Sequence, residues 1–176
     1  LFAVDPIGTG GVLVRSRASP VRERWIAMLR AALPIAQPLR HLPLHTADGR
    51  LLGGLDLNAT LLAGRPVAER GLLAEADGGV LVVAMAERLP SGTTVHIAAA
   101  MDARQTIVER DGLSLCMPAR FGVIALDEGL DDEFAPASLG DRLGFHIDLN
   151  EVAIRDADEF AMDREEILAA QERLSS

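Results

Sequence analysis

The chain has 176 residues, of which 49% are apolar, 24% are charged and 3% are aromatic, and its mean hydropathy is +0.20. This length suits one well-buried domain, and the composition argues against both disorder and a membrane-spanning apolar run of about 18 residues. All 17 basic residues are arginine, which excludes chemistry that requires a lysine, such as a Schiff base or the phosphate-binding lysine of a P-loop.

Charge is distributed unevenly along the chain. Residues 127–176 hold 15 acidic residues and 4 arginines, whereas residues 1–126 hold 11 acidic residues and 13 arginines. The acidic part would repel phosphate backbones, so nucleic acid is not an expected partner. The single cysteine, Cys116, excludes an internal disulfide, fits a reducing compartment and is expected to fill part of the core. The first residues lack an export leader, so we expect a cytoplasmic protein.

The apolar pattern predicts a strand and then a helix near the N-terminus. Residues 12–14 form an apolar run suited to a buried strand. Ser19 and Pro20 offer an N-cap and a first-turn proline, and apolar residues then recur at steps of three and four as far as Leu33. Three shorter elements are expected next: a strand over 39–44, a turn at 48–49 and a helix over 56–63 that ends at Gly64.

The second half of the chain alternates strands with helices. Residues 80–85 show no polar alternation, so we expect a central strand that is buried on both faces of a parallel sheet. A helix over about 90–104 and a β-hairpin over 106–117, turned by an Asp-Gly pair, follow. The remaining elements are expected at 121–126 and 145–149 for strands, and at 136–143 and 163–174 for helices. This alternation predicts an α/β sandwich with a mostly parallel sheet.

Several short motifs fail as cofactor-binding or catalytic signals. The run over 8–11 lacks the third glycine of a dinucleotide fingerprint and precedes its strand. His41 and His45 have helical spacing, but Pro43 lies between them, so we expect surface or strand residues rather than metal ligands. No serine-nucleophile elbow occurs, and Cys116 has no marked base nearby, so a hydrolase is unsupported.

The order of the segments is the informative feature. GGVLV is followed by a helix and a long insert, then by GLLAEADGGVLVV, a helix, a hairpin, PARFGVIAL and LGDRL. This framework, over roughly residues 1–150, resembles the AAA+ modules of magnesium chelatase, the enzyme that inserts Mg²⁺ into protoporphyrin IX. The resemblance implies a three-layer α/β/α AAA+ core over 1–152 with inserted β-hairpins. It also implies that the acidic helical segment over 153–176 leads toward a lid domain outside this chain, so that the chain is part of a larger subunit.

The resemblance breaks at the loop that binds phosphate in the ATPase subunit of that family. Pro20 removes one backbone donor from the phosphate cradle and Val21 adds bulk. A carboxylate at Glu23 would repel a phosphate about 4 Å away by roughly 1 kcal/mol in water and by about 4 kcal/mol at an effective dielectric constant near 20. Aligned with the family's GGVLI and GxxxxGK[ST], the degenerate Walker A positions are Ser16 and Val21 for the glycines, Arg22 for the lysine and Glu23 for the Mg²⁺-binding hydroxyl residue.

The second nucleotide-binding motif is also degenerate. The strand that should end in Asp-Glu ends in Ala84 and Met85, and neither side chain can hold Mg²⁺ or orient water. Loss of both motifs on a retained framework is similar to the D-type subunits rather than to the ATPase subunit I. The resemblance therefore implies a non-hydrolysing subunit that itself binds no cofactor or metal, within a complex that uses ATP and Mg²⁺.

The resemblance also implies partners and interaction residues. The expected partners are the ATPase subunit I and the porphyrin-binding H-type subunit, in a hexameric ring. Arg142 in LGDRL aligns with the arginine finger of subunit I and is expected to act in trans on a neighbour's nucleotide; a surface ion pair with Asp141 or another nearby acid is the alternative. The insert over 51–71 and the hairpin over 106–117 are expected interaction surfaces, the latter through its tip Arg110, Asp111 and Gly112.

Two other functions stay open. An active nucleotide-dependent motor would need the lysine that the chain lacks. A stand-alone α/β binding module or small enzyme would hold its ligand at the carboxyl ends of the strands. Calorimetric titration with ATP and Mg²⁺ distinguishes an active motor from a non-hydrolysing subunit. A pull-down with subunit I distinguishes a stand-alone module from that subunit.

Overall fold

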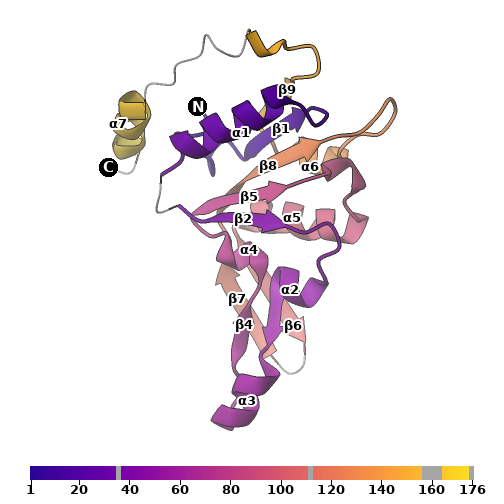
Figure 1. Ribbon diagram of the computed structural model, residues 1–176. Coiled ribbons are helices and arrows are strands. Elements are labelled where there is room, and N and C mark those ends of the chain that lie inside the picture. The colour runs from indigo at the N-terminus through magenta and orange to yellow at the C-terminus, as the bar shows by residue number, and fades with distance from the viewer. Residues whose placement is uncertain (35–36, 111–112, 156–163, 175–176) are drawn as a thin grey trace.

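A five-stranded parallel sheet runs through the molecule. The computed structural model describes residues 1–34, 37–110, 113–155 and 164–174 (Figure 1). All pairings in the main sheet are parallel, so the carboxyl ends of its strands share one edge and the amino ends share the other. The sheet has the order β2-β5-β8-β1-β9, with β1 at Gly11–Arg15, β2 at Leu39–Leu42, β5 at Gly79–Val83, β8 at Phe121–Asp127 and β9 at Phe145–Asp148.

Helices cover both faces of this sheet and give it three layers. On one face, Val21 and Leu29 of α1 (Pro20–Ala32) pack with Val12 and Val14 of β1, and Ile167 of α7 (Arg164–Leu174) adds to this cluster. The other face carries the second apolar cluster, which includes side chains of α2 (Asp48–Leu52), α4 (Leu72–Glu75), the 3-10 turn η1 (Ala86–Arg88), α5 (Ser91–Ala103) and α6 (Ala137–Gly140). The expected α/β sandwich is confirmed. β5 is a fully buried inner strand, as expected, although β8 is the middle one.

Two antiparallel ribbons project from one end of the sheet (Figure 1). The first consists of β3 (Gly53–Leu55), α3 (Leu57–Ala63) and β4 (Ala68–Arg70), and the second of β6 (Gln105–Arg110) and β7 (Leu113–Pro118). The expected hairpin and the helix that ends at Gly64 are confirmed. The interaction tip at 111–112 lies outside the described residues.

Other local predictions have mixed outcomes. The expected turn at 48–49 is the first turn of α2, which the structure forms because it buries Leu51 completely. Cys116 is exposed on β7, where its thiol donates to Gln105 Oε1 at 3.1 Å, so the prediction that it fills the core is wrong. His41 and His45 are exposed, with His41 on β2, as expected. Within the described part of the chain, no helix is long and apolar enough to cross a membrane.

Candidate functional site: a closed nucleotide edge and an arginine at the opposite edge

The degenerate Walker positions lie at the carboxyl edge of the sheet. Ser16 follows β1 directly, Val21 to Glu23 form the first turn of α1, and Ala84 and Met85 follow β5. Arg22, Glu23 and Ala84 line one shallow hollow of about 230 Å³ beside α1. The structure therefore brings together the residues that sequence alignment placed around a lost nucleotide.

Several backbone donors of this edge already have acceptors within the protein. Pro20, the first residue of α1, has no N–H. The side chain of Ser19 accepts from the Arg22 N–H at 3.2 Å, and its carbonyl accepts from the Glu23 N–H at 3.1 Å. In the loop before α1, the Ser16 N–H donates to the Asp127 carbonyl at 2.9 Å and the Arg17 N–H to Asn150 Oδ1 at 3.1 Å. These N–H groups are not available to a phosphate, which normally binds at such a helix start.

Arg22, at the lysine position, is turned into the protein. Its side chain is 11% exposed, and its Nη1 lies 2.8 Å from Glu128 Oε1, while Glu23 Oε1 lies 3.5 Å from Nη2. Nη1 also donates to the Ser16 carbonyl at 3.5 Å, and Nε is buried without an acceptor. Protein carboxylates thus neutralise the charge that a P-loop lysine would offer to phosphate.

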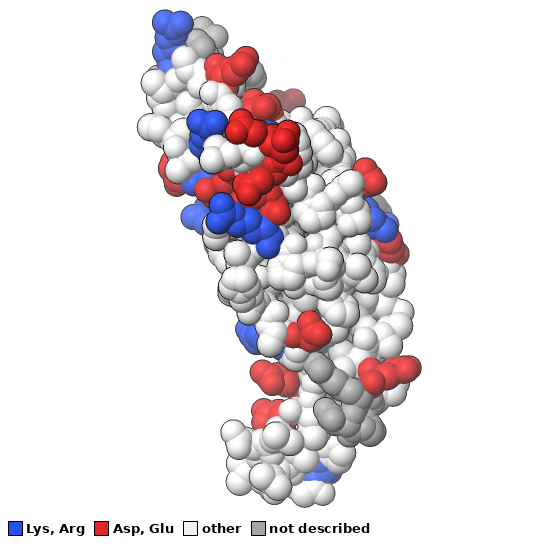
Figure 2. Space-filling view, turned by 90° about the vertical axis from the view of Figure 1, so that its right-hand side faces the viewer, with Lys and Arg blue, Asp and Glu red and all other residues white. Residues whose placement is uncertain are grey.

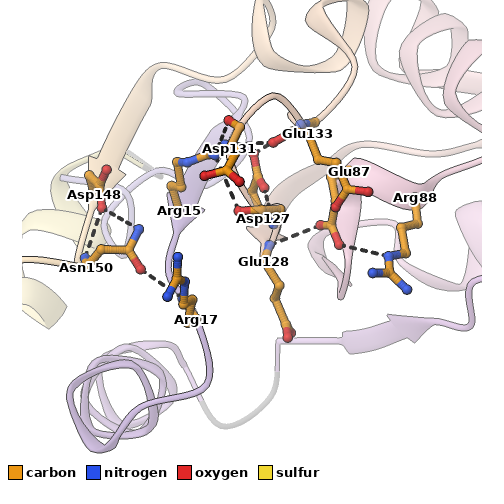
Figure 3. A network of polar contacts seen from close by, with 12 residues as sticks. Arg15, Arg17, Glu87, Arg88, Asp127, Glu128, Asp131, Glu133, Asp148 and Asn150 are labelled. Atoms are coloured by element: carbon orange, nitrogen blue, oxygen red, sulfur yellow. Dashed lines mark hydrogen bonds and ion pairs between the residues drawn. The ribbon is translucent and has the colours of Figure 1, made fainter.

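A buried ion pair joins the ends of β1 and β8 (Figure 3). Asp127 is 1% exposed and accepts from Arg15 Nη1 at 3.2 Å and from the N–H groups of Gly129 at 2.9 Å and Ala135 at 3.0 Å. The Arg15 guanidinium also donates to the carbonyl of Glu133 at 3.0 Å. The sequence analysis missed this pair; its only sequence signal is a charged residue at the end of each apolar strand.

The end of β5 offers no metal ligand. Ala84 and Met85 are exposed, and Met85 has the left-handed backbone (φ 49°) that starts η1. The next carboxylate, Glu87, accepts from the Glu128 N–H at 3.0 Å and lies 3.5 Å from Arg88. The residues of this edge do not fit Mg²⁺ with ATP, since Pro20 has no N–H, the N–H groups of Arg22 and Glu23 are bonded internally, and the aligned lysine and carboxylates are absent from the sequence. No group of three or more potential metal ligands occurs among the described residues.

Arg142 lies at the opposite, amino edge of the sheet, just before β9. Its Nε and Nη2 bind both carboxylate oxygens of Asp102, at 2.8 and 2.5 Å, and Nη1 donates to the Ser138 carbonyl at 2.5 Å. The guanidinium lowers the pKa of Asp102 below its ordinary value. The acid that pairs with Arg142 is thus Asp102 of α5, and the pair lies far from the chain's own Walker positions because the two sheet edges are opposite.

Acidic side chains gather at the carboxyl edge. Figure 2 looks onto this side of the molecule and shows a red cluster in its upper half, next to several arginines. The loop after β8 contributes Asp131, Asp132 and Glu133, all exposed. The closed edge therefore presents carboxylates on the side where a nucleotide-binding relative would hold a nucleotide.

Comparison with known proteins identifies the relatives of the chain. No protein-family profile matches it. The chain is 40% identical, over 100% of its length, to the magnesium-chelatase 60 kDa subunit of Cereibacter sphaeroides, and 37% identical, over 99%, to that of Rhodobacter capsulatus. It is 38% identical, over 82% of its length, to the magnesium-chelatase 67 kDa subunit of Chlorobaculum parvum. The chain is a homologue of these magnesium-chelatase subunits. It spans 28% of the length of each 60 kDa relative and 23% of the 67 kDa one.

The fold comparison agrees. The chain superposes with a TM-score of 0.67 and 24% identity on a chain of the complex between subunits BchI and BchD of magnesium chelatase, covering 98% of this chain and 67% of the other. The expected AAA+ fold and the expected family are both confirmed.

Proposed function

We propose that this chain is the non-hydrolysing AAA+ platform of a magnesium-chelatase D-type subunit, which assembles with the ATPase subunit I during ATP-dependent insertion of Mg²⁺ into protoporphyrin IX. The observation that carries this proposal is the carboxyl edge. There, the N–H groups at the start of α1 and the Arg22 guanidinium, which align with nucleotide-binding groups of the family, are bonded to other groups of the protein. The homology to the 60 and 67 kDa subunits supports the assignment to a chelatase, and the similarity to a chain of a BchI–BchD complex supports partnership with a subunit I.

The domain itself binds no ATP or Mg²⁺ in this proposal; the complex uses both. Calorimetric titration of the chain with ATP and Mg²⁺ should give no heat of binding at concentrations that saturate subunit I, which serves as the positive control. Micromolar affinity, or ATP turnover that is abolished by Glu23→Ala, would contradict the proposal.

Arg142 supplies the arginine finger in trans. It lies at the edge opposite the chain's own degenerate site, and a finger belongs to a neighbour's nucleotide. Arginine fingers contribute about 10³ to 10⁵ in rate in other systems. The experiment measures ATPase activity and Mg²⁺ insertion by wild-type subunit I mixed with saturating Arg142→Ala subunit. Arg173→Ala is the matched control, because Arg173 is exposed, lies outside the insert and the hairpin, and donates to the Ala169 carbonyl of its own helix. Wild-type rates from an assembled Arg142→Ala complex would reduce Arg142 to the surface partner of Asp102.

The wider assembly follows from the same proposal. The AAA+ core spans 1–152, the acidic segment over 153–176 leads to a lid, and the subunit joins a cytoplasmic hexameric ring that couples to the porphyrin-binding H-type subunit. Native mass measurement of the complex with subunit I gives the ring size, and the same measurement with the porphyrin-binding subunit added tests that partner. Absence of a complex with either subunit would reject this arrangement.

A further inference from the structure

A small apolar hollow lies where α5 ends and the ribbon of β6 and β7 begins. It has a volume of about 190 Å³, and its walls include Ala99 and Ala103 of α5, Ile107 of β6, and Leu52. Both alanines are exposed, and Ile107 is 56% exposed. Small-molecule sites usually measure about 300–1,000 Å³, so this hollow suits one or two side chains of another protein better than a cofactor.

One buried group of the hollow has no partner. Thr106 lines the hollow and is 3% exposed, and its Oγ1 makes no hydrogen bond with the described residues. Buried hydroxyl groups are normally hydrogen-bonded, because an unpaired one loses its bonds to water without replacement. The hollow therefore combines apolar walls with a hydroxyl that can donate to an acceptor supplied by another molecule.

The tip of the other ribbon presents a matching surface. Leu57, Leu61 and Leu62 of α3 are 66%, 81% and 90% exposed, and α3 contains no buried residue. Three exposed leucines on one helix form a patch, unlike the single apolar side chains that are common on protein surfaces. The last carbonyl groups of a helix have no partner within it, so the end of α3 also offers acceptors of the kind that Thr106 lacks.

We propose that α3 of one copy of the chain docks in this hollow of a second copy, with its leucines against Ala99 and Ala103 and a carbonyl of its last turn accepting from Thr106. α3 does not reach the hollow of its own chain, because the paired strands β3 and β4 hold it at the far end of the ribbon, whereas α5 lies beside the main sheet (Figure 1). A second copy fits because residues 57–63 carry no charged side chain and no arginine, aspartate or glutamate lines the hollow.

The contact is reciprocal. When the tip of each ribbon lies at the base of the other copy's ribbon, the ribbons run side by side in opposite directions and a two-fold axis relates the copies. Such a contact closes on itself and produces a dimer, not a ring or a filament. It uses none of the groups at the two edges of the main sheet, so this inference goes beyond the proposed function and does not depend on it.

Sedimentation velocity of the full chain without nucleotide, over a range of concentrations at low and high salt, tests this contact. The wild type should form a dimer that persists at high salt, because salt screens contacts between exposed charges and this contact has none. Leu61→Gln, which removes apolar area, and Ala99→Gln, which fills the hollow, should each raise the dissociation constant at least about tenfold. Leu174→Gln and Ala169→Gln make the same changes at exposed positions of α7 and should dimerise like the wild type.

Thr106→Val tests the role of the hydroxyl. The substitution keeps the branched shape of the side chain and removes the donor, so the dissociation constant should rise about threefold or more. The thermal midpoint of the chain, measured at a concentration where it is monomeric, should not fall, because the monomer leaves this hydroxyl unpaired. Circular dichroism shows whether each variant is folded.

Four results would overturn the inference: a wild-type chain that stays monomeric throughout, a dimer that dissociates at high salt, a Leu174→Gln variant that is weakened as much as Leu61→Gln, or a folded Thr106→Val variant that dimerises as tightly as the wild type. Binding to subunit I is measured on the same samples. A chain that stays monomeric but loses binding to subunit I on Leu61→Gln would assign the leucines to that partner and would overturn docking between copies.

Discussion

Replacing Asp127 with alanine tests whether the closed edge is held by its buried ion pair. The substitution removes the carboxylate that accepts from Arg15, Gly129 and Ala135. It leaves the Gly129 N–H, in a buried residue, without its acceptor, and it leaves the guanidinium with the backbone carbonyls of the loop and the Phe134 ring, whose centroid lies 4.1 Å from the Arg15 Cζ. The loop after β8 should therefore loosen and the domain should lose stability.

The structure sets the size of the loss. Breaking a buried ion pair by removing one partner costs about 3–5 kcal/mol. The Arg15 side chain keeps its carbonyl acceptors and is 21% exposed, so its charge is partly solvated and the lower end, about 3 kcal/mol, is expected. Asp127→Asn keeps an oxygen acceptor for one N–H and should cost less, about 1–2 kcal/mol. Asp132→Ala, on the exposed part of the same loop, should change stability by less than about 0.5 kcal/mol.

Urea unfolding monitored by circular dichroism gives these free energies, and a double-mutant cycle with Arg15→Ala isolates the coupling between the two side chains. A loss below about 1 kcal/mol for Asp127→Ala, or no coupling with Arg15, would refute the conclusion that this pair closes the edge.

Three further predictions concern other parts of the fold. Gly10→Ala should destabilise the domain more than Gly64→Ala. Both glycines have left-handed backbones (φ 72° and 66°), but only at Gly10 would a Cβ clash with a backbone atom, the carbonyl oxygen of Arg142. Equal thermal midpoints of the two variants would contradict this. The Arg120 guanidinium lowers the pKa of Asp77, so the stability from this pair is present above the ordinary carboxyl pKa and is lost as pH falls through the lowered one. The free energy of unfolding should therefore fall more steeply below about pH 4 in the wild type than in Asp77→Asn. If the free energies obtained by urea unfolding fall in parallel with pH in the two proteins, this pair does not contribute to the pH dependence. Deleting residues 110–112 should weaken assembly or chelatase activity while the thermal midpoint of the chain is kept, because loop tips tolerate deletion; unchanged activity of the full complex would argue against the hairpin as an interaction surface.

Local pattern was sufficient for the elements that build the main sheet. The uninterrupted apolar run of β5 and the Asp-Gly turn between β6 and β7 are signals contained within a few residues. Short helices such as α2 and α4 lacked such a signal, since each is stabilised by burying one or two leucines against distant strands rather than by caps or periodicity. The exposure of Cys116 likewise depends on the hairpin standing apart from the main sheet, which its own sequence does not encode.

The candidate site likewise has one part that the sequence predicts and one part that it does not. Residue type alone predicted that these positions do not suit a nucleotide, because Pro20 has no N–H, Val21 adds bulk, and Ala84 and Met85 carry no oxygen for Mg²⁺. The ion pair at this edge depends on topology: Arg15 and Asp127 are 112 positions apart and meet only because β1 and β8 are neighbours in the sheet.

The two edges of the sheet use different charged groups. At the carboxyl edge, Arg22, Glu128 and Asp127 form ion pairs within the protein, which in the proposed function leaves these groups unavailable to phosphate. The amino edge needs none of these groups, because Arg142 is positioned by Asp102 of α5 and by the carbonyl of Ser138. The degenerate Walker positions and the arginine finger that we propose at Arg142 are therefore structurally independent in this fold. Under the proposed function, this independence explains how a subunit that does not hydrolyse ATP can contribute to a neighbour that does.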